Sequence, residues 1–137
     1  MEDLTLIPGR WCKPPPGYKK LNIDGGFRDA QGSFGSVLRD DEGNWIWGFN
    51  GSNNANDALH AKIISLKRGL EALVEKNVGR TIIETDSSNK VNLIHGTIDE
   101  DHPRFGLIME CKNMIGLLSY TFVVLAIVIL VRMCWLN

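Results

Sequence analysis

The chain has 137 residues, 44% of them hydrophobic and 23% charged, which is an ordinary composition for one globular domain with its own core. Its net charge of −1 excludes a global basic field, so a nucleic-acid partner would have to be held by a local patch. The three cysteines have no ligand spacing and predict neither a disulfide framework nor a zinc site. The first residues lack the pattern of a secretory signal, and we expect an intracellular protein of the nucleus or cytoplasm.

The first half of the chain predicts a tether followed by three strands. Residues 1–18 are expected to be the tether, because the Pro-Pro-Pro-Gly run at 14–17 favours an extended conformation. Apolar and β-branched runs predict strands at 19–24, 33–39 and 44–50, and the acidic loop 40–43, which ends in Gly, predicts a hairpin. Residues 51–56 are expected to form a polar loop.

A helix is predicted over 58–76, capped by Asp57 and ended by the Asn-Val-Gly segment 77–79. Its apolar stripe comprises Leu59, Ile63, Leu66, Leu70, Leu73 and Val74. A strand over 81–85 and a short helix over 88–94 follow. Because the helix over 58–76 connects two strands of the same sheet, the strand over 81–85 should lie parallel to a neighbour. Residues 105–118 have near-helical apolar spacing.

Two aspartates stand at the ends of strand-like runs. Asp24 closes Leu-Asn-Ile-Asp-Gly-Gly, and Asp86 closes Thr-Ile-Ile-Glu-Thr-Asp. Carboxylates at the mouth of a sheet are typical of metal ligands or acid/base groups in open α/β folds. The alternative is that Asp24 begins a turn and Asp86 caps the next helix.

These motifs, in this order, resemble the plant ribonuclease H-like domains, which are retrotransposon-derived relatives of type 1 ribonuclease H. The likeness lies in residues 11–25, 35–40, 43–49, 58–70 and 83–87, and a weaker echo continues to Leu125. The resemblance implies an α/β fold with a mixed five-stranded sheet and flanking helices, in the order strand-strand-strand-helix-strand-helix-strand. It also implies an RNA–DNA hybrid as partner and hydrolysis of its RNA strand with two Mg²⁺ ions as cofactors.

Carried over by the resemblance, Asp24 and Asp86 are the first and third of four catalytic, metal-binding carboxylates. The second should be a Glu directly after an Ala on the first helix, and here that position is Lys62. At a separation of about 4 Å and an effective dielectric near 20, two unit charges interact by about 4 kcal/mol, so a cation here would repel Mg²⁺. Lys62 could instead pair with the aspartates, or extend to solvent. Glu84 stands two residues before Asp86 on the same predicted strand, so its side chain should point to the same face as that of Asp86 but lie deeper in the sheet.

The fourth carboxylate and the family's terminal helix have no counterpart, because no Asp follows Asp101. The chain therefore divides into the tether, a ribonuclease H-like domain at 19–124 and a divergent apolar tail at 125–137. One hypothesis for the tail is a truncated or frame-altered C-terminus. Magnesium binding is expected to be poor, and hydrolysis weak or absent.

Residues 113–131 carry no charge and meet the length criterion for a transmembrane helix. Their β-branched content favours a strand, which the family resemblance places at about 121–124. A single-pass membrane protein through 113–131 therefore stays open as an alternative localisation. A non-catalytic, membrane-tethered or protein-interaction remnant is the alternative function.

Nucleic-acid contact is expected at Gly25, Gly26 and Arg28, beside Asp24. A wider basic patch could track phosphates, although solvated surface charge explains most of its members equally well: Lys19, Lys20, Arg28, Lys62, Lys67 and Arg68. Trp45 and Trp47 alternate with Ile46, so we expect them to share one strand face and to pack the sheet. The histidines show no arrangement with a nucleophile.

Overall fold

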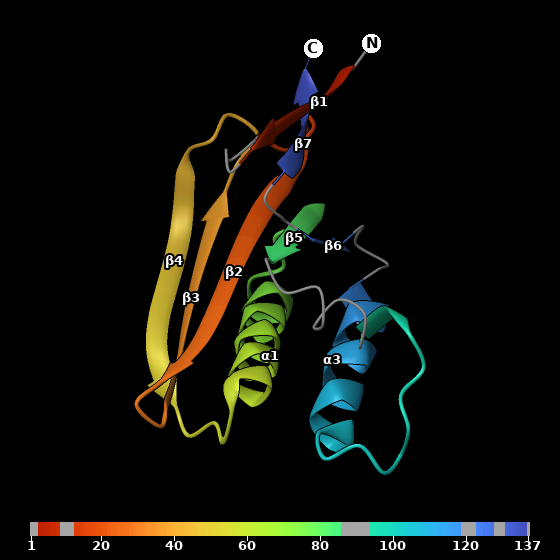
Figure 1. Ribbon diagram of the computed structural model, residues 1–137. Helices are drawn as coiled ribbons and strands as arrows, with labels where there is room; N and C mark the ends of the chain where they lie inside the picture. The colour runs from red at the N-terminus through yellow and green to blue at the C-terminus, as the bar shows by residue number, and fades with distance from the viewer. Residues whose placement is uncertain (1–2, 9–12, 86–93, 119–122, 128–130, 137) are drawn as a thin grey trace.

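The computed structural model describes residues 3–8, 13–85, 94–118, 123–127 and 131–136, with side chains for 13–85 and 94–118 (Figure 1). Its main body is a five-stranded sheet in the order β4-β3-β2-β5-β6, and β1 and β7 form a separate two-stranded ribbon. The elements are β1 (Asp3–Pro8), β2 (Lys19–Arg28), β3 (Gln31–Arg39), β4 (Trp45–Asn53), α1 (Ala58–Lys76), β5 (Thr81–Thr85), α3 (Phe105–Leu118), β6 (Val123–Ile127) and β7 (Val131–Leu136).

The sheet is mixed, which confirms the predicted fold class. Strands β2, β3 and β4 form an antiparallel meander, whereas β5 pairs in parallel with β2 and with β6. The helix α1 connects β4 to β5, so the parallel pairing predicted for residues 81–85 is confirmed. In Figure 1, α1 lies to the right of β2, and α3 lies beside α1 on the side away from the sheet.

The turn between β3 and β4 is fixed by one carboxylate. Asp40 Oδ1 accepts hydrogen bonds from the backbone N–H groups of Glu42 at 3.0 Å and Asn44 at 2.8 Å. The hydrogen bond from the Asn44 backbone is the main cause that lowers the pKa of Asp40. Gly43 adopts φ = 89°, a conformation that favours glycine. The predicted hairpin is therefore confirmed.

Strand β4 is longer than the sequence predicts. Gly51, Ser52 and Asn53 were expected to begin a polar loop, but they pair with β3 opposite Phe34, Ser33 and Gly32. The Asn53 carbonyl also accepts a hydrogen bond from Gln31 Nε2 at 2.8 Å. Polarity alone is a poor guide here because an edge strand can expose polar side chains and still satisfy its backbone through pairing.

The helix α1 begins and ends where the sequence predicts. Asp57 Oδ1 accepts a hydrogen bond from the His60 backbone N–H at 2.8 Å, and Asn77 closes the other end in the left-handed conformation. Most of the predicted stripe is buried against the sheet and α3. Val74 is the exception, at 42% exposed. The fully buried members of the core include Leu21, Leu38, Leu66, Leu70, Ile83, Ile108 and Cys111.

The helix predicted over 88–94 lies outside the described residues except for Ile94. Ile94 and His95 are helical. Residues 105–118 form α3, as their spacing indicates. Its Lys112 ammonium donates to the carbonyl oxygens of Ile94 and Gly96, which ties α3 to the segment before it.

The transmembrane alternative for residues 113–131 is not supported. Its described parts are divided among the end of α3, strand β6 and the start of β7. None of the helices in the described part of the chain has the length and apolar character that a bilayer crossing needs. The β-branched residues instead form strand β6, which begins two residues later and ends three residues later than the range that the resemblance indicated.

The two ends of the chain pair with each other. Strand β1, from the segment predicted to be a tether, runs antiparallel to β7, with Asp3 opposite Leu136 and Pro8 opposite Val131. The described residues after β6 thus form a strand, where the family's order would place its terminal helix. The proposed boundaries at residues 18 and 124 stay predictions.

We expect Leu66→Ala to lower the free energy of unfolding by about 2–5 kcal/mol, because Leu66 is fully buried between α1 and the sheet. Val74→Ala, on the exposed flank of the same helix, should change it by less than about 1 kcal/mol. Urea unfolding of both variants measures the difference. Equal losses would contradict the packing of α1 described here.

Candidate functional site

The two faces of the central strand β2 differ in chemistry. Leu21 and Ile23 face α1 and are buried, whereas Lys20, Asn22 and Asp24 alternate with them and face the other way. We call this second side the open face, because the described helices lie on the opposite side of the sheet (Figure 1). The register continues the open face across β3 and β4 in three rows: Lys20–Arg39–Trp45, Asn22–Val37–Gly48 and Asp24–Gly35–Asn50.

Two glycines hollow the open face. Gly48 sits in the second row and Gly35 in the third, where any larger residue would fill the space between β2 and the sheet edge. A cavity of about 710 Å³ lies there, which is within the size range of small-molecule sites. Residues from four strands line it: Asn22, Ile23, Asp24, Gly35, Ser36, Val37, Trp45, Gly48, Phe49, Asn50, Glu84 and Thr85.

Asp24 stands in this cavity with its carboxylate exposed. Among the described residues, no hydrogen bond or ion pair occupies its side chain. Asp86 follows directly after Thr85, the last residue of β5, and lies outside the described residues. Its placement beside Asp24 therefore stays a prediction.

Lys62 lies on the turn of α1 that approaches the strand end at Asp24. A side-chain carbon at Gly25, the residue after Asp24, would stand 2.5 Å from Ser65 Oγ and 3.2 Å from the Ala61 carbonyl oxygen. Ser65 Oγ in turn donates to the Lys62 carbonyl oxygen at 2.6 Å. The predicted pairing of Lys62 with Asp24 is not found, since the ion pairs among the described residues do not include it. Lys62 is half-buried on the flank of the helix.

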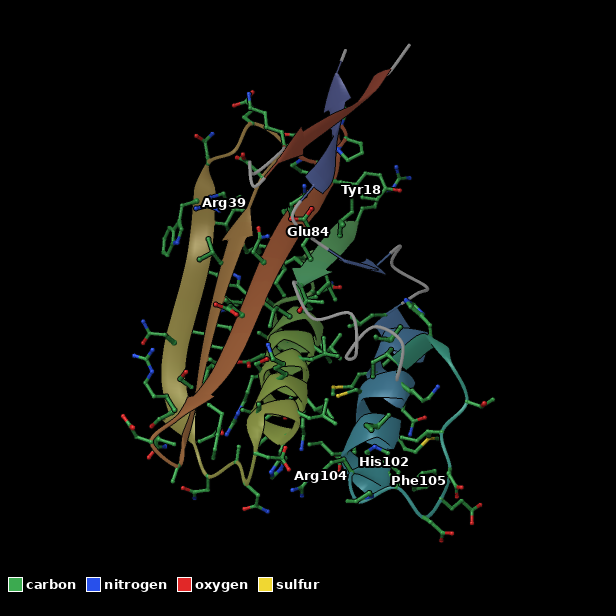
Figure 2. The ribbon with its side chains drawn as sticks, viewed as in Figure 1. Tyr18, Arg39, Glu84, His102, Arg104 and Phe105 are labelled. Carbon is green, nitrogen blue, oxygen red and sulfur yellow. The ribbon has the colours of Figure 1, made fainter. Side chains whose placement is uncertain are left out.

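A buried polar network joins β2 to β5 on the open face. Lys20 Nζ lies 2.9 Å from Glu84 Oε2, and Asn22 Nδ2 donates to Glu84 Oε1 at 2.8 Å. The side chains of Lys20 and Glu84 are only 4% and 11% exposed. The sequence predicted that the Glu84 side chain lies deep in the sheet. It did not predict the contacts with Lys20 and Asn22, because these depend on the parallel register that sets Asn22 beside Glu84. Figure 2 labels Glu84 toward the upper end of the sheet.

The structure does not gather the predicted basic patch on one surface. Lys20 is buried in the network above, and the Lys19 ammonium donates to the Val78 carbonyl at 3.1 Å. Arg28 is exposed at the far end of β2, about 30 Å from Lys19 at the usual rise of a strand. Lys67 pairs with Glu110 of α3 at 2.7 Å, and this contact raises the pKa of Lys67.

His60 and His102, near the starts of α1 and α3, accept hydrogen bonds from backbone N–H groups. His60 Nδ1 accepts from the Asn56 backbone N–H at 3.0 Å, and His102 Nδ1 accepts from that of Arg104 at 3.0 Å. Burial, followed by the nearby Arg104 charge, lowers the pKa of His60. Figure 2 shows His102 and Arg104 at the lower end of α3, away from Glu84. Neither histidine lines the cavity.

The expectation that Trp45 and Trp47 share one face is wrong. The register shifts between Leu38 and Arg39, so that Leu38 pairs with Trp47 but Arg39 pairs with Trp45. This bulge leaves Ile46 without a partner on β3 and places the tryptophans on opposite faces. The bulge lies in β4 itself, where Trp45 and Ile46 together stand opposite Arg39. The alternation of Trp45, Ile46 and Trp47 in the sequence gives no sign of this extra residue, and this is why it was misleading.

Trp47 packs on the inner side, where its ring stacks on Phe49 at a centroid distance of 5.3 Å and the Lys76 ammonium lies 5.2 Å from its centroid. Trp45 belongs to the open face, lines the cavity and is 63% exposed.

The described residues do not fit a two-magnesium centre. They contain no cluster of three or more His, Cys, Asp or Glu side chains placed to hold a metal ion. Mg²⁺ requires several oxygen ligands in near-octahedral geometry, whereas Glu84 already holds Lys20 and Asn22. Lys62, on the helix turn next to Gly25, carries an ammonium and offers no oxygen ligand.

Residues 22–125 match the sequence model of the family described as reverse transcriptase-like. The chain belongs to this family. The match ends at Leu125, where the resemblance read from the sequence also ends. No curated protein matches the chain.

Solved ribonuclease H structures share the fold. Ribonuclease H1 from the halophilic archaeon Halobacterium salinarum aligns with a TM-score of 0.67 and 18% identity, over 82% of this chain and 86% of its own. The N-terminal ribonuclease H domain of a Mycobacterium tuberculosis protein aligns with a TM-score of 0.68 and 17% identity, over 82% of both chains. The compost-derived LC11 ribonuclease H1, in a complex with an RNA/DNA hybrid, aligns with a TM-score of 0.65 and 17% identity, over 81% of this chain and 85% of its own.

We expect Glu84→Gln to lower the free energy of unfolding by about 3 kcal/mol, because it removes the carboxylate charge that lies 2.9 Å from the buried Lys20 ammonium. The amide keeps an oxygen for Asn22, so the loss of charge is the main change. The double variant Lys20→Met/Glu84→Gln should recover part of the loss, since no buried charge remains. Urea unfolding of both variants tests this, and a double variant less stable than Glu84→Gln would contradict it.

Proposed function

We propose that this domain binds RNA–DNA hybrids on its open face and hydrolyses them weakly or not at all. Three observations support hybrid binding: the family match, the ribonuclease H fold, and a structural neighbour whose complex contains an RNA/DNA hybrid. Asp24 lies in the cavity of the open face, at the end of the buried part of β2.

Asp86 is assigned to the same site. Thr85, the residue before it, pairs in parallel with Ile23, the residue before Asp24. Continuation of this register would bring the two carboxylates side by side on neighbouring strands. We assign contacts with the hybrid backbone to Gly25, Gly26 and Arg28, which follow Asp24, because peptide N–H groups and guanidinium are common phosphate donors.

The low activity follows from Lys62. This position is the second carboxylate in the family that the sequence resembles, and it stands on the helix turn that packs against Gly25. A cation there repels a divalent ion and supplies no oxygen, so the aspartates alone would have to hold it. Hybrid binding without efficient cleavage is the outcome we infer.

We expect Lys62→Glu to raise the affinity for Mg²⁺ at least about tenfold, equivalent to about 1.4 kcal/mol, because it replaces a repelling charge by an oxygen ligand. Isothermal titration calorimetry measures this. Lys62→Gln is the matched control, since it removes the charge while adding only a neutral oxygen, and its gain should be smaller. The same proteins should be assayed for cleavage of a labelled hybrid, and equally robust cleavage by wild type and Lys62→Glu would contradict the proposal.

A further inference from the structure

Trp45 is a large aromatic side chain that the fold leaves uncovered. It is 63% exposed although most of an indole is apolar, and it lies on the edge strand β4 at the rim of the cavity. Trp47, two residues on, is packed on the other side of the same strand. The bulge at Ile46 therefore places Trp45 on the open face, and its ring is not part of the hydrophobic core.

The surface next to Trp45 is shaped for a flat group. A side-chain carbon at Gly48 would stand 3.3 Å from Trp45 Nε1 and 2.8 Å from the Ser36 carbonyl oxygen. Glycine at this position therefore lets the indole lie close to the strand. Beyond Gly48, the neighbouring row has glycine again at Gly35, so the floor beside the indole is shallow, with Val37 opposite Gly48 as its apolar side chain.

The charge of the cavity decides which part of a ligand can enter it. Its charged lining residues among those described are Asp24 and Glu84. Lys20 Nζ, 2.9 Å from Glu84 Oε2, offsets the charge of Glu84, so the exposed Asp24 supplies the negative charge of the cavity. A phosphate would be repelled, whereas the N–H groups of a base and the hydroxyls of a ribose can donate to Asp24 and to the side-chain oxygen of Asn50. The cavity therefore suits the base and sugar of a nucleotide with its phosphate directed outward.

We infer that the open face binds an unpaired nucleotide of a single-stranded segment, with its base stacked on Trp45 and its sugar directed toward Asp24. Stacking needs an open base face, which the paired interior of a hybrid duplex does not offer, so the ligand is a single strand or an overhang. The inference goes beyond hybrid recognition and rests on the proposed function only in assuming that this face meets nucleic acid.

Fluorescence anisotropy with a labelled oligoadenylate of eight ribonucleotides tests the inference. Trp45→Leu, which keeps apolar bulk but removes the ring, should weaken binding at least about fivefold, as loss of one base–aromatic stack does. Trp45→Phe should keep affinity within about threefold of wild type. Leu117→Ala, which truncates an equally exposed apolar side chain on α3 (61% exposed), should have no effect.

An abasic strand of the same length provides the second arm, and all variants should bind it with the same low affinity. Three results would each overturn the inference: no binding of oligoadenylate by wild type, unchanged affinity in Trp45→Leu, or equal affinity for the abasic and base-bearing strands.

A blunt hybrid duplex, measured in parallel, separates the two proposals. Wild-type binding to the duplex tests the proposed function, and its absence would leave the single-strand result standing. Trp45→Leu should bind the duplex within about twofold of wild type, since paired bases do not stack on the ring. An equal loss on duplex and single strand would overturn the stacking role. Thermal unfolding followed by circular dichroism checks that each variant is folded.

Discussion

The close approach of α1 to β2 is the contact on which the rest of the domain depends. It requires residues without side chains at two points of the interface. A side-chain carbon at Gly25 would stand 2.5 Å from Ser65 Oγ, and one at Gly69 would stand 2.5 Å from Ile23 Cδ1. Because helix and strand touch here, the buried leucines of α1 fill the inner side of the sheet and the strand ends are held at a fixed distance from the helix.

This contact also sets the electrostatics of the site. The turn of α1 that packs on Gly25 carries Lys62, so a cation lies on the helix beside the strand that carries Asp24. On the open face, Lys20 and Glu84 neutralise each other below the cavity, which leaves Asp24 as its exposed carboxylate. The same scaffold that could orient metal ligands thus presents an acidic, glycine-floored cavity with an aromatic rim. This is the surface to which we assign the base and sugar of an unpaired nucleotide.

Much of the architecture was predictable because it follows from local rules. The helix from Ala58 to Lys76 has an Asp cap, a stripe of apolar residues and a left-handed Asn at its end, and all three signals lie in the sequence itself. The β3–β4 hairpin is likewise encoded by Asp40 and Gly43. The role of the 113–131 segment was less predictable, since an apolar run of that length is compatible with a membrane helix and with buried strands, and only its division among α3, β6 and β7 separates them.

The sequence by itself determined the family and the mixed sheet, because residue types at fixed spacing carry that information. It also shows that Lys62 stands at the position that the family resemblance gives to the second carboxylate. The tertiary structure decided which side chains meet. The parallel register placed Glu84 beside Asn22 and Lys20, and a bulge in β4 turned Trp45 to the open face while Trp47 went to the core. These outcomes depend on pairing between strands distant in sequence, where a shift of one residue reverses the face of a side chain.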